Sequence, residues 1–485
     1  MKKLAAVLLF AGVAAASDLR QAGLPLTEAE KRGRHLYRHG ESRSARPVTA
    51  LVGGANGAEI AASALACGSC HGVEGRGVPE GSIEPADIRA ASLSNDLVKP
   101  ARRRPRYDDA QLARALREGR DSEDQPLSPV MPRYRMDDRD LADLVAYLRR
   151  LGNEPQPGLA DEELTVATVA TDELTRKVLE GYFADVNAQG GVHGRSLKLS
   201  PSVQDAFAIL CATPDPALQS LVDEERIPLL TPLPFAPGPS SFFLFSDVAG
   251  QTVALAKHAG AGKHAGAGKH AGAGPHAGAG PHAGAGPRDV YILHDDSAAA
   301  RAAAAALEER AASLQWNVRS SLDAKKSDDD LLFLIGVDPA EAMRRLDELR
   351  WHPRVFIAGA PLAGLPPYAN DVVLAAPTLP GDLTTEGRRE LGAFTARYGL
   401  PETHLAAQIA AYSAAKVFVE ALKRAGRELT REKLIATLET FYQYPTGLTR
   451  PVTYARNRHV GARGAFIVRI DGNRFVPAGD WVAAE

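Results

Sequence analysis

The chain contains 485 residues, which is too long for a single hydrophobic core and favours two to four domains. Hydrophobic residues make up 45% of it and charged residues 24%, as in water-soluble globular proteins. The formal net charge of −2 provides no basic field, so the composition argues against a nucleic-acid partner.

Residues 1–16 have the pattern of a secretory signal peptide. Lys2 and Lys3 precede an apolar run from Leu4 to Val13, and three alanines follow as a small-residue cleavage site. The run is shorter than the roughly 20 residues that span a bilayer, and no later stretch has the length and apolar composition of a span. We therefore expect a periplasmic protein without a transmembrane segment in its mature chain.

The stretch "ALACGSCHGVEGRG", residues 64–77, contains two of the three cysteines. A disulfide is one interpretation in an oxidising compartment. A zinc site lacks a second ligand pair at the usual spacing, and a thioredoxin-type dithiol would follow a strand pattern that does not precede Cys67. The spacing C-x-x-C-H favours covalent attachment of a c-type haem, with thioethers at Cys67 and Cys70 and iron coordination by His71.

A second axial ligand for such a haem is available downstream. The chain has only four methionines, and Met131 lies 131 − 71 = 60 residues after His71, directly before a proline. An amphipathic helix is predicted behind it, because Leu141, Leu144 and Leu148 recur at helical spacing. A methionine thioether is a common distal ligand of electron-transfer haems.

With these motifs, residues 17–152 resemble a class I monohaem cytochrome c domain. The resemblance rests on the CxxCH, the glycines that follow it, the "MPRY" loop and the closing "DLADLVAYLRRL" helix. It implies an all-α fold and one covalent haem c, held by Cys67, Cys70 and His71, with Met131 as the distal iron ligand.

Three other side chains compete with Met131 for the distal position. Met136 lies in the same segment, where core packing is the alternative, and His35 and His39 lie in "KRGRHLYRHG". Met131 is favoured because the adjacent proline matches the family loop. A basic segment from Lys99 to Asp109 is interpreted either as a solvated loop or as a docking patch for an acidic redox partner or the haem propionates.

Residues 153–162 contain prolines, a glycine and acids without periodicity, which predicts a linker. The remaining chain begins with a strand candidate at 164–170, and helical patterns then alternate with apolar strand-length runs such as "FFLFS" and "DLLFLIG". That alternation predicts α/β architecture with parallel sheets.

Residues 163–485 resemble a type I periplasmic binding protein of the branched-chain amino-acid receptor kind. The resemblance is carried by "YFADVNAQGGVHGRSLKL", "AAYSAAKVFVEALKRAG" and the C-terminal "GLTRPVTYARNRHVGARGAFIVRIDGNRFVPAGDWV". It implies a two-lobed α/β fold, a small-molecule ligand held in the cleft between the lobes, and an ABC permease as partner.

In that family, first-lobe hydroxyls bind the carboxylate of an amino acid and a second-lobe acid binds its ammonium group. Thr213 and Thr231 are the hydroxyls at the matching positions, and turn capping is their alternative role. No acid follows Phe356 in "FIAGAPLAG", and the stretch from Val203 to Leu230 is compressed. The missing acid puts amino-acid binding in doubt.

Residues 257–286 repeat KHAGAG three times and PHAGAG twice. Histidine-rich tracts can bind metal, but a period of six does not gather the histidines on one face of a helix or strand. The tract is interpreted as a low-complexity insert within an otherwise regular helix-to-strand connection.

These features predict an electron carrier and binding protein rather than an enzyme. The first interpretation is a periplasmic c-type cytochrome with a redox partner protein, either a dehydrogenase or another cytochrome. Its receptor-like domain would then dock the haem unit to a dehydrogenase or sense a substrate. The alternatives are an ABC-transporter receptor with an accessory haem domain, and a sensor that couples cleft closure to the haem potential.

Overall fold

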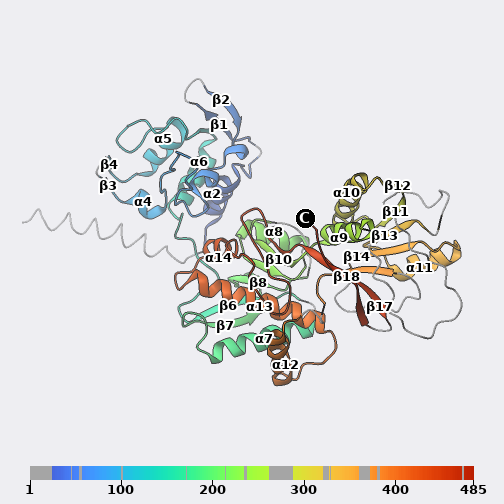
Figure 1. Cartoon of the computed structure of the whole chain (residues 1–485). Coiled ribbons are helices and arrows are strands. Elements are labelled where there is room, and N and C mark those ends of the chain that lie inside the picture. Colours follow the sequence, from blue (N-terminus) through green and yellow to red (C-terminus); the bar gives the residue numbers. More distant parts are fainter. Residues whose placement is uncertain are drawn as a thin grey trace, which may run out of the picture. The chain divides into compact units, whose positions relative to one another are not determined.

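The computed structural model describes residues 25–484, except 45, 54–56, 100–101, 171, 214, 234–237, 262–287, 320–326, 328, 360–371, 380–382 and 472–473. The chain divides into two compact units, residues 1–156 and 157–485, which are described separately (Figure 1). The predicted signal peptide lies outside the described residues.

The first unit contains short helices around one apolar core. They are α2 (Glu28–His39), the 3₁₀ helix η1 (Ala62–Leu65), α3 (Cys67–His71), α4 (Ala90–Ser94), α5 (Asp109–Glu118) and α6 (Asp138–Leu148). Capping boxes begin α2 at Thr27 and α5 at Asp108, and left-handed glycines end them at Gly40 and Gly119.

An all-α first unit is not confirmed, because the unit also contains strands. An antiparallel sheet has the order β2 (Ala58–Ala61), β1 (Thr49–Val52), β5 (Arg133–Arg135), and β3 (Leu97–Lys99) pairs with β4 (Arg102–Arg104). These segments of three or four residues are too short for stable helices, and strand pairing satisfies their backbone hydrogen bonds. The register places Tyr134 opposite Ala50, and both are buried.

Helices α2 and α6 cross at close range. A Cβ atom added at Gly33 of α2 would lie 2.0 Å from the carbonyl oxygen of Asp143 and 2.8 Å from the Cβ of Tyr147 in α6. Tyr37 and Tyr147 are fully buried beside this crossing, with ring centroids 5.5 Å apart. Glycine at position 33 therefore permits the contact between the two helix backbones.

Charged groups reinforce the same contact. Arg32 donates two hydrogen bonds to the carboxylate of Asp143, at 2.6 and 2.9 Å, and Arg150 lies 3.4 Å from Glu30. Glu154, which lies in the predicted linker, accepts a hydrogen bond from the Tyr147 hydroxyl. The first residues of that segment are thus bound to the helical core.

The second unit begins with a lobe built on a six-stranded, entirely parallel sheet. Its strands, in the order β16 (Val460–Ala462), β10 (Ser241–Phe245), β9 (Leu229–Thr231), β8 (Ala208–Leu210), β6 (Glu163–Ala167) and β7 (Ser196–Ser200), show the predicted parallel α/β pattern. Successive residues pack on opposite faces: Leu210 joins the core formed with α7 (Glu173–Ala188), α12 (Thr385–Arg397), α13 (Leu405–Ala425) and α14 (Arg431–Leu438). Ile209 joins the core beside α8 (Pro216–Glu225).

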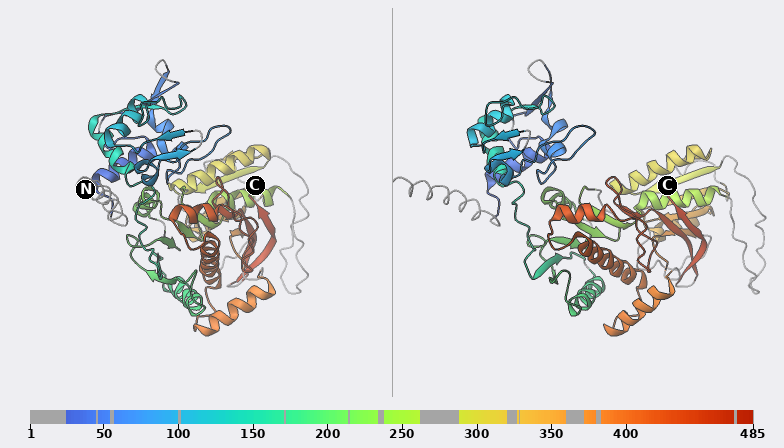
Figure 2. Two further views of the ribbon diagram at one scale, coloured as in Figure 1. Left: turned by 90° about the vertical axis from the view of Figure 1, so that its left-hand side faces the viewer. Right: turned by 60° about the vertical axis from the view of Figure 1, so that its left-hand side comes forward.

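The second lobe contains a seven-stranded mixed sheet. Its order is β12 (Asn317–Arg319), β11 (Asp289–His294), β13 (Leu331–Ile335), β14 (Arg354–Ala358), β15 (Val372–Ala376), β17 (Gly464–Asp471) and β18 (Arg474–Ala483). Strand β17 pairs antiparallel with both β15 and β18. The helices α9 (Val248–Gly260) and α10 (Ala298–Ser313) lie side by side on one face (Figure 2), and α11 (Pro339–Glu348) packs on the other.

The chain passes between the lobes after β10, after β15 and between β16 and β17. The buried hydroxyl of Ser246 joins two of these crossings, because it accepts a hydrogen bond from the Gly464 amide at 2.6 Å. Gln251 of α9 adds a bond from its side chain to the Ser246 carbonyl. A polar contact thus links the two crossings.

One helix departs from the expectation that no later stretch is apolar and long enough to span a membrane. Among the described residues, α13 is long and apolar enough to cross a membrane, by length and composition alone, with a mean hydropathy of 1.3 over its most apolar window. However, 72% of that window is buried inside the unit, where α13 forms the centre of the first-lobe core. Core helices of globular proteins share these properties, so the finding is weak evidence for a span.

The histidine repeat is largely outside the described residues. Its first four residues, Lys257–Gly260, form the last turn of α9, and β11 resumes at Asp289. The interpretation of the repeat as an insert, and its metal binding, stay predictions.

Candidate functional site

The CxxCH motif forms the five-residue helix α3, at Cys67–His71. Cys67 and Cys70 are free thiols and lie three residues apart, so they project from one face of the helical turn. Cys67 is half-buried and Cys70 is exposed. Burial raises the pKa of the Cys67 thiol to about 11. Two free thiols on one face are a suitable geometry for two thioether bonds to one planar group.

The imidazole of His71 is held by its Nδ1 atom, which lies 2.9 Å from the carbonyl oxygen of Ala86. A carbonyl can only accept, so this contact places the proton on Nδ1 and leaves Nε2 with a free lone pair for a metal. Burial lowers the pKa of His71, which also favours the neutral ligating form. This backbone partner, 15 residues away, was not predicted from the sequence.

The glycines after the motif shape a tight loop that returns to α3. The amides of Gly77 and Val78 donate to the carbonyls of His71 and Cys70, at 2.8 and 2.9 Å. Gly77 has a φ of 87°, and a Cβ there would lie 2.2 Å from the Pro85 carbonyl oxygen. Only glycine fits this position, and the loop thereby fixes the C-terminal end of α3.

Two buried tyrosines also support the motif. The Tyr37 hydroxyl donates to the carbonyl of Gly72 at 2.6 Å, directly after His71. The Tyr134 hydroxyl donates to the carbonyl of Leu65 at 2.7 Å, two residues before Cys67. The sequence signal that could have indicated them is weak, since a buried tyrosine needs some hydrogen-bond partner but the pattern does not say which.

Met131 lies in the loop between α5 and β5 and is half-buried. It packs against the same apolar cluster as Cys67, so the predicted distal ligand and the predicted attachment site share one core. The Met131 amide donates to the Ser128 carbonyl at 3.1 Å, and the following Pro132 is buried. The loop that holds the thioether is therefore an ordered turn.

The structure also gives the positions of the three side chains that compete with Met131. Met136 is half-buried and packs against the same cluster, so it stays a rival to Met131. His35 and His39 lie one turn apart on α2, with ring centroids 4.7 Å apart, and His39 is exposed. The two histidine rings lie in contact, tilted by 42° relative to each other.

The residues present fit a covalently bound haem. They provide two thiols on one face, an imidazole with its Nε2 lone pair free, and a thioether against the same core. Within the described part of the chain, no group of three or more histidine, cysteine or acidic residues could hold a bare metal ion. A porphyrin supplies four iron ligands itself, so a histidine and a methionine complete the set.

The basic segment from Lys99 to Asp109 divides into two kinds of residue. Arg104 is buried, donates to the carbonyls of Ser92 and Pro105, and lies 4.6 Å from the centroid of the Tyr107 ring. It therefore joins the end of β4 to α4 and to the loop that follows β4. Arg103 and Arg106 are exposed. The docking interpretation rests on those exposed positions.

In the second unit, the predicted cleft residues lie at the carboxyl ends of the first-lobe strands. Thr231, at the end of β9, is 2% exposed, and its hydroxyl donates to the Ala212 carbonyl at 3.3 Å. Thr168, after β6, donates in the same way to the Cys211 carbonyl at 3.2 Å. Cys211 itself has a left-handed φ of 53°. The two hydroxyls thus hold a strained strand end, the capping role weighed for Thr231.

Thr213 is exposed in the same loop, so its hydroxyl is accessible. The helices α7 and α8, which begin next to these strand ends, are capped by the carboxylates of Asp172 and Asp215 at 2.7 and 2.8 Å. A negative charge at each helix N-terminus disfavours a second anion there. The loop after Phe356 lies mostly outside the described residues.

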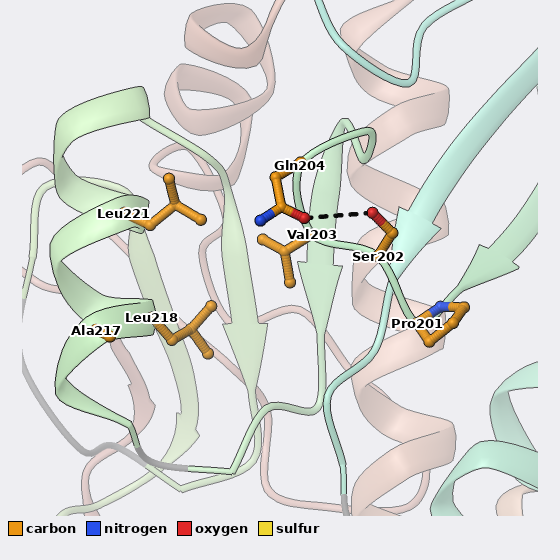
Figure 3. A pocket seen from close by; sticks show the side chains of 7 residues that line it. All are labelled: Pro201, Ser202, Val203, Gln204, Ala217, Leu218 and Leu221. Carbon is orange, nitrogen blue, oxygen red and sulfur yellow. Dashed lines mark hydrogen bonds between the residues drawn. The ribbon is translucent and has the colours of Figure 1, made fainter.

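A groove of about 510 Å³ opens elsewhere on the first lobe, between the β7–β8 connection and α8 (Figure 3). It is lined by Pro201, Ser202, Val203, Gln204, Ala217, Leu218 and Leu221. The connection between β7 and β8 contains no helix. This agrees with the compressed sequence of that region. Neither Thr213 nor Thr231 lines the groove.

Two family models match the chain. A periplasmic binding protein model matches residues 202–474, and a cytochrome c model matches residues 54–152. The fold and these matches define a two-lobed periplasmic-binding-protein domain joined to a cytochrome c domain, and the latter implies a covalently bound haem. The periplasmic binding protein model covers more than half of the chain, so the chain belongs to the periplasmic binding protein family.

Solved structures are similar to this chain over about two thirds of its length. An ABC transporter substrate-binding protein from Desulfitobacterium hafniense is similar at 16% identity over 65% of this chain and 99% of its own, with a TM-score of 0.51. A branched-chain amino acid ABC transporter protein from Thermus thermophilus with bound valine is 16% identical over 67% of this chain and 97% of its own, with a TM-score of 0.47. The comparison with curated proteins gave no match.

Proposed function

We propose that the protein is a periplasmic electron carrier whose single haem c is attached at Cys67 and Cys70 and ligated by His71 and Met131. The observation that carries the proposal is the Nδ1 contact of His71 with Ala86, which leaves Nε2 for iron. When bound, the haem supplies one-electron redox chemistry. The chain's own residues would attach it through Cys67 and Cys70, fix the imidazole orientation and supply the Met131 thioether as an iron ligand.

The receptor unit is proposed to dock the haem unit to a redox partner, a periplasmic dehydrogenase or another cytochrome, or to sense a substrate of that partner. The ends of the first-lobe strands support ranking this role above that of an amino-acid receptor. The Thr231 hydroxyl is used within the fold, and Asp172 and Asp215 cap the adjacent helices, so a carboxylate ligand is poorly served. An amino acid is therefore a less suitable cleft ligand than a neutral or cationic solute.

The second candidate function is an ABC-transporter receptor for a small solute, with the haem unit as an accessory. The length of the match favours it, because the receptor model covers residues 202–474 whereas the cytochrome model covers 54–152. Thr213 is exposed and is the first-lobe residue proposed to contact such a ligand.

The haem assignment is tested on the exported protein. We expect an α-band on reduction, one haem per chain and a mass increase that survives denaturation. Met131→Ala should lower the reduction potential and open the iron to added imidazole, because a thioether ligand raises the potential and occupies the position. Met136→Ala is the matched control and should change neither. If the two variants exchange these results, Met136 is the ligand; if no α-band forms, the cytochrome function is wrong.

The receptor role is tested by thermal shift of the haem-loaded protein against amino acids, short alcohols, aldehydes, amines and organic acids. A ligand at 100 times its Kd stabilises the native state by about 2.7 kcal/mol, so binding raises the melting temperature. A hit that Thr213→Ala abolishes supports a working cleft. No hit favours docking as the role of this unit.

A further inference from the structure

Arg133 forms a clamp on the loop that ends in Met131. Its Nη2 atom donates to the carbonyl oxygen of Leu127 at 3.1 Å and to that of Ser128 at 3.4 Å. Its Nη1 atom donates to the carbonyl oxygen of Met131 itself. One planar guanidinium thus bonds to both ends of the turn from Leu127 to Met131.

The strand that carries Arg133 is fixed on the other side. In β5, Arg133 pairs with Leu51 and Tyr134 with Ala50 of β1. Tyr134 points to the opposite face and bonds to the Leu65 carbonyl, just before the CxxCH motif. Consecutive residues of one strand therefore hold the methionine loop and the cysteine-containing helix.

The end of α5 leaves room for the guanidinium. Gly119, which ends α5 with a φ of 70°, would place a Cβ atom 1.7 Å from Nε and 1.9 Å from Cζ of Arg133. The Leu127 amide donates to the Gly119 carbonyl at 2.7 Å, so the same glycine anchors the start of the loop.

From this geometry we propose that Arg133 is a positioning residue for the distal methionine, which keeps the Met131 thioether on the iron by clamping its loop to β5. The inference rests on the proposed function, because it requires Met131 to be the ligand. Hydrogen bonds from a charged donor are stronger than neutral ones, and a planar fork fixes direction as well as distance. Lysine could contact only part of this set of carbonyls.

The experiment uses the haem-loaded full-length protein and measures the Kd of ferric haem for imidazole, which competes with the methionine. Opening of the loop raises the apparent affinity in proportion to the open fraction. We expect Arg133→Ala to bind imidazole at least about tenfold more tightly than wild type, a change of about 1.4 kcal/mol, and Arg133→Lys to lie between. The methionine-to-iron charge-transfer band should disappear at a lower temperature in the same order.

Arg135→Ala is the matched control. Arg135 lies on the same strand, is exposed, and pairs with Glu59 at 2.8 Å on the surface. Its loss should change imidazole affinity by less than about twofold, since exposed ion pairs contribute little. Gly119→Ala is the independent variant, because it displaces the guanidinium without changing Arg133, and it should resemble Arg133→Ala.

The outcomes separate the two levels of the argument. If Met131→Ala binds imidazole tightly and the Arg133 variants behave as wild type, the positioning role is overturned while the ligand assignment stands. If Met131→Ala behaves as wild type, the ligand assignment fails and the positioning role fails with it. In the Met131→Ala background, Arg133→Ala should add less than about a twofold effect, because the clamp then has no ligand to hold. A full additional tenfold effect would show that Arg133 acts on the iron site by another route.

Discussion

Gly33→Ala should destabilise the first unit, although alanine is the better helix former. In an exposed helix, the exchange gains about 1 kcal/mol. At the α2–α6 crossing, the new methyl group would lie 2.0 Å from the Asp143 carbonyl oxygen and 2.8 Å from the Tyr147 Cβ, where ordinary contacts are about 3.5 to 4.0 Å. The obstructing atoms belong to a backbone and a Cβ, so the helices themselves must separate.

Overpacking of this kind costs about 1 to 3 kcal/mol, and a backbone obstruction belongs at the upper end. Subtracting the helix gain leaves a net loss of about 2 kcal/mol, which is about 8 °C in the melting temperature of a domain of this size. Haem absorbance during heating reports on the first unit separately from the second. Gly392→Ala on α12 of the second unit is the control for the helix gain alone: no atom lies within 4 Å of its added Cβ, so the unfolding transition of the second unit should stay unchanged or rise. An unchanged or higher haem-unit transition for Gly33→Ala would refute the reasoning.

Three further predictions concern the cysteines and two buried polar side chains of the second unit. Burial raises the pKa of Cys211, so its thiol stays protonated, and we expect no thiol of the native haem-loaded protein to react with DTNB at pH 8. After unfolding, one thiol should react. Three reactive thiols would mean that Cys67 and Cys70 carry no thioethers. Arg431→Ala removes the buried donor to the carbonyls of Phe207, Ala206 and Glu225. Denaturant unfolding should show a free energy of unfolding lower by about 3 kcal/mol. The control Arg389→Ala, at an exposed position, should change it by less than about 0.5 kcal/mol. Thr231→Val should cost about 1 kcal/mol in the same assay and leave any ligand affinity unchanged; a loss of affinity with unchanged stability would instead assign the hydroxyl to the cleft.

The sequence by itself determined those features whose chemistry is local. The spacing of Cys67, Cys70 and His71 indicates haem attachment because all three groups lie within five consecutive residues. The alternation of apolar runs with helical patterns predicted the parallel α/β architecture, because hydrophobic periodicity reports the burial of each segment separately. Both family resemblances followed from such continuous motifs.

Only the tertiary structure decided the features that depend on distant partners. The three-residue strand β5 has no periodicity of its own, and its pairing with β1, about 80 residues earlier in the chain, made the purely helical expectation for the first unit incomplete. The partners of His71 and Arg133 are backbone carbonyls, which every residue type carries, so no side-chain pattern identifies them. The Ala212 carbonyl that accepts from the Thr231 hydroxyl is likewise a backbone partner that no side-chain pattern identifies.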